Sequence, residues 1–177
     1  MKRSPFFQRA LGTLITTACM AIAAGSAPRN QLALHVTLVT REHSRDSSSV
    51  TRNFTVSAKT LVYEETHHGA RANRHQPVKK EYKLTAEDRS ALIRLLKSFP
   101  RTETISRSFN QGATRDFELS IHSKLAGRES AISIQAPRTA TDLRNDRSYR
   151  TSVEVIEQLY RIINRTDADI AMPELID

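Results

Sequence analysis

Residues 64–77, EETHHGARANRHQP, concentrate the side chains whose types could hold a metal ion. The candidate ligands are Glu64, Glu65, His67, His68 and His75. Neutral imidazoles together with a carboxylate bind zinc or copper. However, His67 and His68 are neighbours, and neighbouring side chains on a strand point to opposite faces. The segment has no hydrophobic period, so we predict a long polar loop and assign it no metal and no cofactor.

Basic residues in and after this segment form a second candidate, an anion-binding patch. They are Arg71, Arg74, Lys79 and Lys80. Isolated charges along a strand edge more often keep that edge soluble and prevent edge-to-edge pairing. We therefore interpret these residues as solubilising charges.

A third candidate is a triad of Asp116, Ser120 and His122 on one face of a predicted strand. Alternate residues on a strand lie ~6.5–7 Å apart, and nothing here indicates an activated nucleophile. The sequence also lacks G-x-S-x-G, H-E-x-x-H, Walker and C-x-x-C motifs. We assign no catalytic residue and favour a protein that is not an enzyme, although a site assembled from distant segments would escape this test.

Two amphipathic helices are predicted to support these segments. Residues 85–99 place Leu92, Leu95, Leu96 and Phe99 on one face, and Thr85 with Asp88 forms a capping box. A second capping box, Thr151-Ser152-Val153-Glu154, predicts that the other helix begins at residue 151. The segment between residues 137 and 150 is polar, and we predict a loop there.

Alternating apolar residues predict about six strands. They cover residues 32–40, 50–57, 78–84, 103–109, 115–124 and 128–136. Alternation changes parity near residues 58–60, which indicates a bulge or bend. We expect an α+β domain in which an antiparallel sheet carries both helices on its apolar face. The opposite face, with Thr, Ser, Lys and His, would meet water or a partner.

The first 27 residues have the features of a signal peptide. Lys2, Arg3 and Arg9 precede an uncharged apolar run, residues 10–24, and small residues favour cleavage after Ala23. A retained anchor is the alternative, but the run is shorter than the ~20 apolar residues of a spanning helix. Lipid attachment at Cys19, the only cysteine, is a further alternative. Localisation is then secreted or periplasmic, with one domain over residues 28–165 and an acidic, flexible tail over residues 166–177.

Charge and cysteine content limit the partners of the mature chain. Removing three basic leader residues from the 27 Lys and Arg leaves 24 against 19 Asp and Glu, a net charge of +5. Such a chain could attract an anionic polymer or touch a membrane surface, but export makes nucleic acid an unexpected partner. Without Cys19 the mature chain has no cysteine, which excludes disulfides and zinc-thiolate sites.

The order hairpin, helix, hairpin, helix resembles small protease-inhibitor folds such as the emfourin-like domains. The resemblance concerns layout, and REHSRDSSS at residues 41–49 stands where a glycine-rich turn would be, so no residue role is carried over. We expect a non-catalytic binding or interaction module of the cell envelope. The alternatives are a protease inhibitor presenting residues 64–77 or 137–150, and an enzyme with a site assembled across the sheet.

Overall fold

Alternating apolar side chains build the centre of the sheet. In the computed structural model, which describes residues 32–43, 47–69, 72–108 and 114–176, strand β1 (Leu32–Glu42) buries Leu34, Val36 and Leu38 on one side. It pairs antiparallel with β2 (Ser48–Val56) and with β6 (Arg115–Leu125). These three strands therefore share one apolar face and one polar face.

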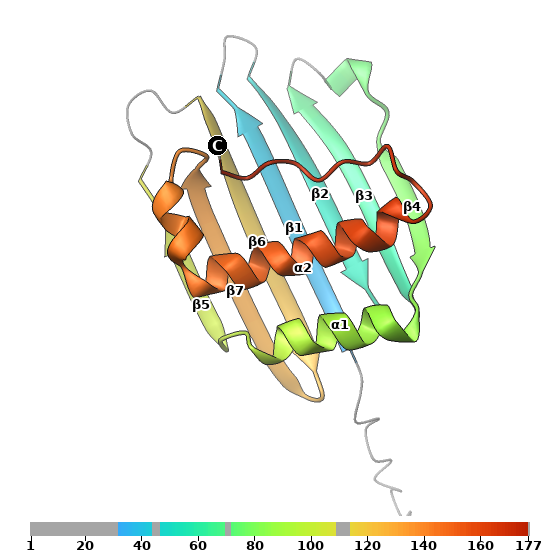
Figure 1. Ribbon diagram of the computed structural model, residues 1–177. Coiled ribbons are helices and arrows are strands. Elements are labelled where there is room, and N and C mark those ends of the chain that lie inside the picture. The colour runs from blue at the N-terminus through green and yellow to red at the C-terminus, as the bar shows by residue number, and fades with distance from the viewer. Residues whose placement is uncertain (1–31, 44–46, 70–71, 109–113, 177) are drawn as a thin grey trace, which may run out of the picture.

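The complete sheet has seven strands in the order β4-β3-β2-β1-β6-β7-β5. The outer strands are β3 (Thr60–Gly69), β4 (Val78–Lys83), β7 (Arg128–Pro137) and β5 (Thr102–Ser106). The α+β class is confirmed, but the prediction of six antiparallel strands is wrong, because β5 runs parallel to β7. Helix α1 (Ala86–Lys97) carries the chain across one end of the sheet, so β5 starts at the end where β4 stops (Figure 1).

Strand β3 was not predicted from the sequence. The parity change near residue 58 is not a bulge but a hairpin turn, where Ser57 N–H donates to the Thr60 carbonyl at 2.9 Å. From that turn β3 continues to Gly69, so the predicted loop over residues 64–77 is wrong for its first part. The predicted turn between β6 and β7 is confirmed: Ala126 and Gly127 both have positive φ, 50° and 81°, as a type I′ turn requires.

Both predicted helices exist, with one corrected boundary. Thr85 and Asp88 form the expected capping box of α1. Helix α2 (Arg147–Asn164) begins four residues before the predicted Thr151, because the Asp146 carboxylate accepts from the N–H groups of Ser148 and Tyr149. A short 3-10 helix η2 (Thr141–Asn145) precedes it, so the loop predicted over residues 137–150 is wrong for most of its length.

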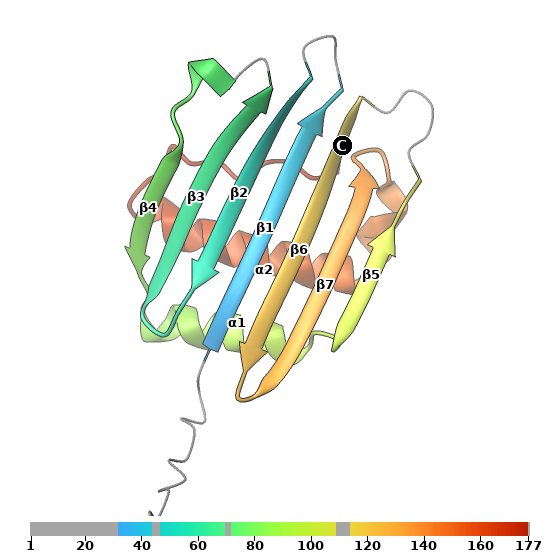
Figure 2. The same cartoon turned by 180° about the vertical axis from the view of Figure 1, so that it is seen from behind.

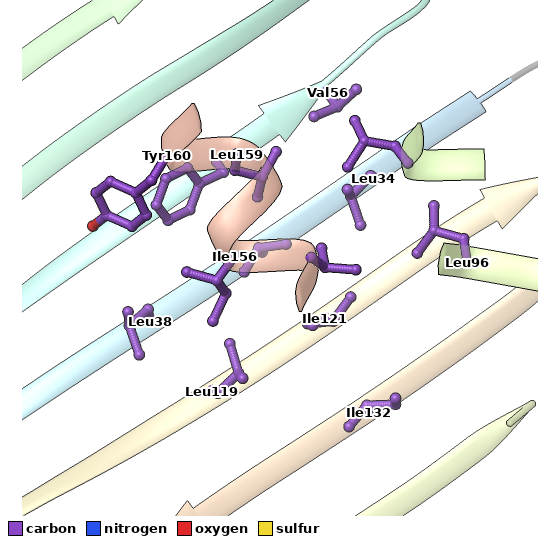
Figure 3. Packing of buried hydrophobic residues seen from close by; sticks show 14 of the residues in the cluster. Leu34, Leu38, Val56, Leu96, Leu119, Ile121, Ile132, Ile156, Leu159 and Tyr160 are labelled. Atoms are coloured by element: carbon purple, nitrogen blue, oxygen red, sulfur yellow. The ribbon is translucent and has the colours of Figure 1, made fainter. Parts of the chain in front are cut away.

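The two helices lie side by side on one face of the sheet (Figure 1). Helix α2 crosses the strands obliquely, and its Ile156, Leu159 and Tyr160 lie over the sheet side chains (Figure 3). Leu96 of α1 contributes to the same core near Ile132. The two helices therefore exclude water from one face of the sheet.

Residues 166–176 run back across the same face, beside α2 (Figure 1). Asp167 accepts hydrogen bonds from Lys80 at 2.6 Å and Tyr82 at 2.8 Å. Near the end of the chain, Leu175 and Ile176 are buried, with 4% and 6% of their surface exposed. The segment predicted as an acidic tail thus adds its own apolar residues to the core.

Within the described ranges, no helix is long and apolar enough to cross a membrane. The predicted leader, its cleavage after Ala23 and the Cys19 alternative lie outside these ranges.

Candidate functional site

One face of the sheet is not covered by any described helix or loop (Figure 2), and we call it the open face. Its side chains alternate with the buried ones on every strand and align in rows across the sheet. One row, in register from β2 to β5, is Thr55, His35, His122, Ala131 and Thr102. The next row is Asn53, Thr37, Ser120, Ser133 and Thr104. The centre of the open face therefore carries hydroxyl, amide and imidazole groups.

Hydrogen bonds between these side chains order the open face. The Thr37 hydroxyl donates to Asn53 Oδ1 at 2.9 Å, and His35 Nδ1 shares a hydrogen bond with the Thr55 hydroxyl at 3.1 Å. Short side chains such as Thr and Ser have few rotamers to lose. These four side chains thus form a pre-ordered set of donors and acceptors.

Charged groups lie around this centre, and several of them form ion pairs. Arg41 donates to Asp116 at 3.1 Å and to Glu118 at 2.7 Å. The hydrogen bond to Glu118, more than any other contact, raises the pKa of Arg41. Lys124 contacts Glu129 at 2.9 Å on the neighbouring strand. These pairs leave the open face close to electrically neutral.

A shallow depression of about 590 Å³ lies in the open face. Ala33 and Ala131 contribute small side chains to it, and His35, His122 and Arg101 also line it. His35 and His122 are both exposed and stand opposite each other on β1 and β6. The depression is therefore lined in part by small side chains, two imidazoles and one guanidinium group.

The candidate ligands of residues 64–77 are divided between the two faces. Glu64 contacts Lys79 at 2.7 Å at the margin of the open face, and His68 is exposed. Glu65 and His67 lie on the covered face, as the alternation of adjacent strand residues requires. His75, which follows the 3-10 helix η1 (Ala72–Arg74), stacks on His67 with ring centroids 4.2 Å apart. Among the described residues no cluster of three or more His, Cys, Asp or Glu is arranged to hold a metal ion.

Glu65 is the centre of a half-buried network on the covered face. Its carboxylate accepts from the Tyr63 hydroxyl at 2.6 Å and from Arg52 Nε at 2.9 Å, and it shares a hydrogen bond with His67 Nε2 at 3.0 Å. Burial by itself would raise the pKa of Glu65, but these hydrogen bonds and the Arg52 charge hold it below its ordinary value. Burial, reinforced by the bond to Glu65, raises the pKa of Tyr63. The network stabilises the ionised carboxylate.

The structure does not assemble the other two sequence candidates. Lys79 and Lys80 point to opposite faces of β4, where they pair with Glu64 and Asp167. Arg74 is exposed on η1, and Arg71 lies outside the described residues.

In the candidate triad, Asp116 is engaged by Arg41 and by His43 Nε2, the latter at 2.6 Å, rather than by His122. Ser120 and His122 stand in different rows of the open face.

The alignment of rows across the open face could not be read from the sequence. Strand alternation identified the Thr, Ser and His positions, but their neighbours depend on strand order and register. No family model matches the chain, and a search of curated proteins finds no match.

Proposed function

We propose that this protein is a non-catalytic binding module of the cell envelope, and that its open face is the surface that meets a partner protein. The proposal rests on the difference between the two faces of the sheet. Helices α1 and α2 and the final residues all lie on one face, while no described element lies on the other (Figures 1 and 2). A face of aligned hydroxyl and amide groups can dock a partner without burying an unpaired charge.

The side chains of the open face favour a protein over an anionic polymer or a glycan. Several of its basic groups are paired with carboxylates, so these groups offer little net attraction to a polyanion. All four tyrosines are buried, so their ring faces cannot stack on sugar rings. Ser, Thr, Asn and His side chains instead supply adaptable hydrogen bonds of the kind that protein interfaces use.

The predicted leader indicates where this partner would be located. The basic residues and apolar run of the leader favour transport out of the cytoplasm, and cleavage after Ala23 would release residues 24–177. We therefore place the partner among proteins of the periplasm or the cell surface.

The protease-inhibitor alternative receives no support from the two segments that suggested it. Strand β3 and helix η1 occupy most of residues 64–77, and η2 with the start of α2 occupies most of residues 137–150. In the part of these two segments that the structure describes, we find no long projecting loop of the kind that a protease would accept.

A comparative pull-down tests the proposal. The mature protein, the variant Ser120→Arg and the control Ser90→Arg are tagged and incubated with envelope extract, and bound proteins are quantified by mass spectrometry. Ser120 lies at the centre of the open face and Ser90 is exposed on α1, so the two variants add the same side chain on opposite faces. We expect a protein that wild type and Ser90→Arg retain equally and that Ser120→Arg loses by about tenfold. Equal recovery by all three, with unchanged folding, would refute the proposal.

A further inference from the structure

A second polar cavity lies away from the centre of the open face, at the end of the sheet where β1 stops and β2 begins. It has a volume of about 550 Å³ and is bounded on one side by Pro173 and Glu174 of the final segment. Figure 1 shows that segment crossing the covered face beyond α2. We call this cavity the arginine cleft.

The charges that line the arginine cleft are mostly positive. Four arginines, two histidines and two glutamates contribute to it: Arg41, Arg52, Arg115, Arg138, His67, His75, Glu42 and Glu174. Arg41 and Arg52 are held by carboxylates that do not line the cleft, namely Asp116, Glu118 and Glu65. These contacts fix two guanidinium groups in place, and their charge still contributes to the potential inside the cleft.

The remaining two arginines make long ion pairs within the cleft. Arg115 Nε lies 3.7 Å from Glu42, and Arg138 Nη2 lies 3.4 Å from Glu174. Strong charge-assisted hydrogen bonds between nitrogen and oxygen are ~2.7–2.9 Å long, so both pairs are suboptimal. An incoming anion that reached both guanidinium groups could make bonds shorter than these two ion pairs.

The position of Glu174 would let an external anion replace it. Its side chain is 71% exposed and belongs to the final segment, whereas the Arg138 side chain is only 16% exposed. Leu175 and Ile176 anchor the chain directly after Glu174, so the carboxylate can swing away while the segment stays docked. Glu174 thus occupies the position that an external anion would take.

We infer that the arginine cleft binds a ligand carrying a carboxylate or phosphate group, with Arg115 and Arg138 as its main contacts and Glu174 as the internal competitor that it displaces. This site shares Arg41 with the margin of the open face but none of the residues of its two central rows, and it does not depend on the partner proposed there. The preference for arginine is meaningful, because the planar guanidinium binds both anions through two hydrogen bonds.

Histidine resonances provide a local readout of this site. The chain has six histidines, of which His67 and His75 line the arginine cleft, while His35 and His122 line the depression on the open face. The mature protein is titrated with inorganic phosphate, and separately with acetate, at constant pH and ionic strength while ring proton shifts are followed by NMR. We expect saturable shifts of His67 and His75 with His35 and His122 unchanged. The anion that binds with the higher affinity identifies the ligand class, phosphate or carboxylate.

Three variants decide the roles of the contacts. Glu174→Gln removes the competitor and should tighten anion binding by about threefold, while Arg138→Gln should weaken it by about tenfold. If Arg138→Gln does not fold, Arg115→Gln replaces it, since the Arg115 side chain is 50% exposed. Equal shifts at all four histidines, or the same affinity in Glu174→Gln and wild type, would overturn the inference. Neither result would affect the pull-down test of the open face.

Discussion

The two faces of the sheet use polar side chains in different ways. On the open face the central groups are short and uncharged, and they bond to one another, as Thr37 does to Asn53. On the covered face the polar groups are long and ionic, and Arg52, Tyr63 and His67 all converge on Glu65. Burial explains the difference, because a charge removed from water needs a partner, whereas an exposed hydroxyl does not. A partner can therefore displace water from the open face without a large desolvation free energy, whereas the polar groups of the covered face already bond to one another.

The largest expected effect is a difference in stability between substitutions at two adjacent residues of β6 that lie on opposite faces. Leu119 is fully buried beneath α2 and Ser120 lies on the open face. Leu119→Ala should lower the free energy of unfolding by about 2–5 kcal/mol, because it leaves a cavity in the core. Ser120→Ala should change it by less than about 0.5 kcal/mol. Urea unfolding followed by circular dichroism measures both, and similar losses in the two variants would break the distinction between the faces.

A second pair of neighbours, Glu65 and Glu64, compares the ionic groups of the two faces. Glu65→Gln leaves Arg52 without its carboxylate and should cost about 1–3 kcal/mol at pH 7. Glu64→Gln removes only an exposed contact with Lys79 and should cost at most about 1 kcal/mol. Urea midpoints of both variants and wild type provide the measurement.

The effect of Glu65→Gln should also depend on pH. The pKa of Glu65 is lowered in the folded protein, so its contribution is complete above the unfolded value of about 4.3 and disappears as pH falls through the lower folded value. The stability difference between wild type and Glu65→Gln should therefore shrink as pH falls from about 5, just above the ordinary carboxyl value, to about 2. A difference that grew on acidification would contradict the network.

The smallest expected effect concerns the hydrogen bonds of the open face. Thr37→Ala removes the donor to Asn53 and should lower stability by about 0.5 kcal/mol, because water replaces the lost bond. Thermal unfolding gives the stability, and the pull-down described above gives recovery of the partner. A loss of several kcal/mol would mean that this hydrogen bond is structural rather than part of a prepared surface.

Much of the architecture was predictable from local pattern. The alternation in β1, β6 and β7 identified the two faces, and Thr85 with Asp88 marked the start of α1. These features depend on residues close in sequence, where spacing determines direction. The prediction that one face would be polar followed directly from the same alternation.

The errors arose where distant contacts override local pattern. Residues Glu65 and His67 made β3 look like a loop, because their polar side chains face inward only with Arg52 and His75 beside them. The parallel pairing of β5 depends on the path of α1 across the sheet, which periodicity does not encode. Asp146 is the N-cap of α2, but the capping-box pattern at Thr151 led to a predicted helix start that is too late in the sequence. The acidic residues of the final segment also obscured Leu175 and Ile176, which are too few to form a period.

Site-specific photo-crosslinking tests the role of the open face most directly. A photoreactive amino acid replaces Ser120 in one variant and Ser90 in another, and each mature protein is irradiated in envelope extract. We predict a crosslinked adduct of one defined mass from position 120 and none from position 90. Equal adducts from both positions, or an adduct from position 90 alone, would contradict the assignment of the open face as the binding surface.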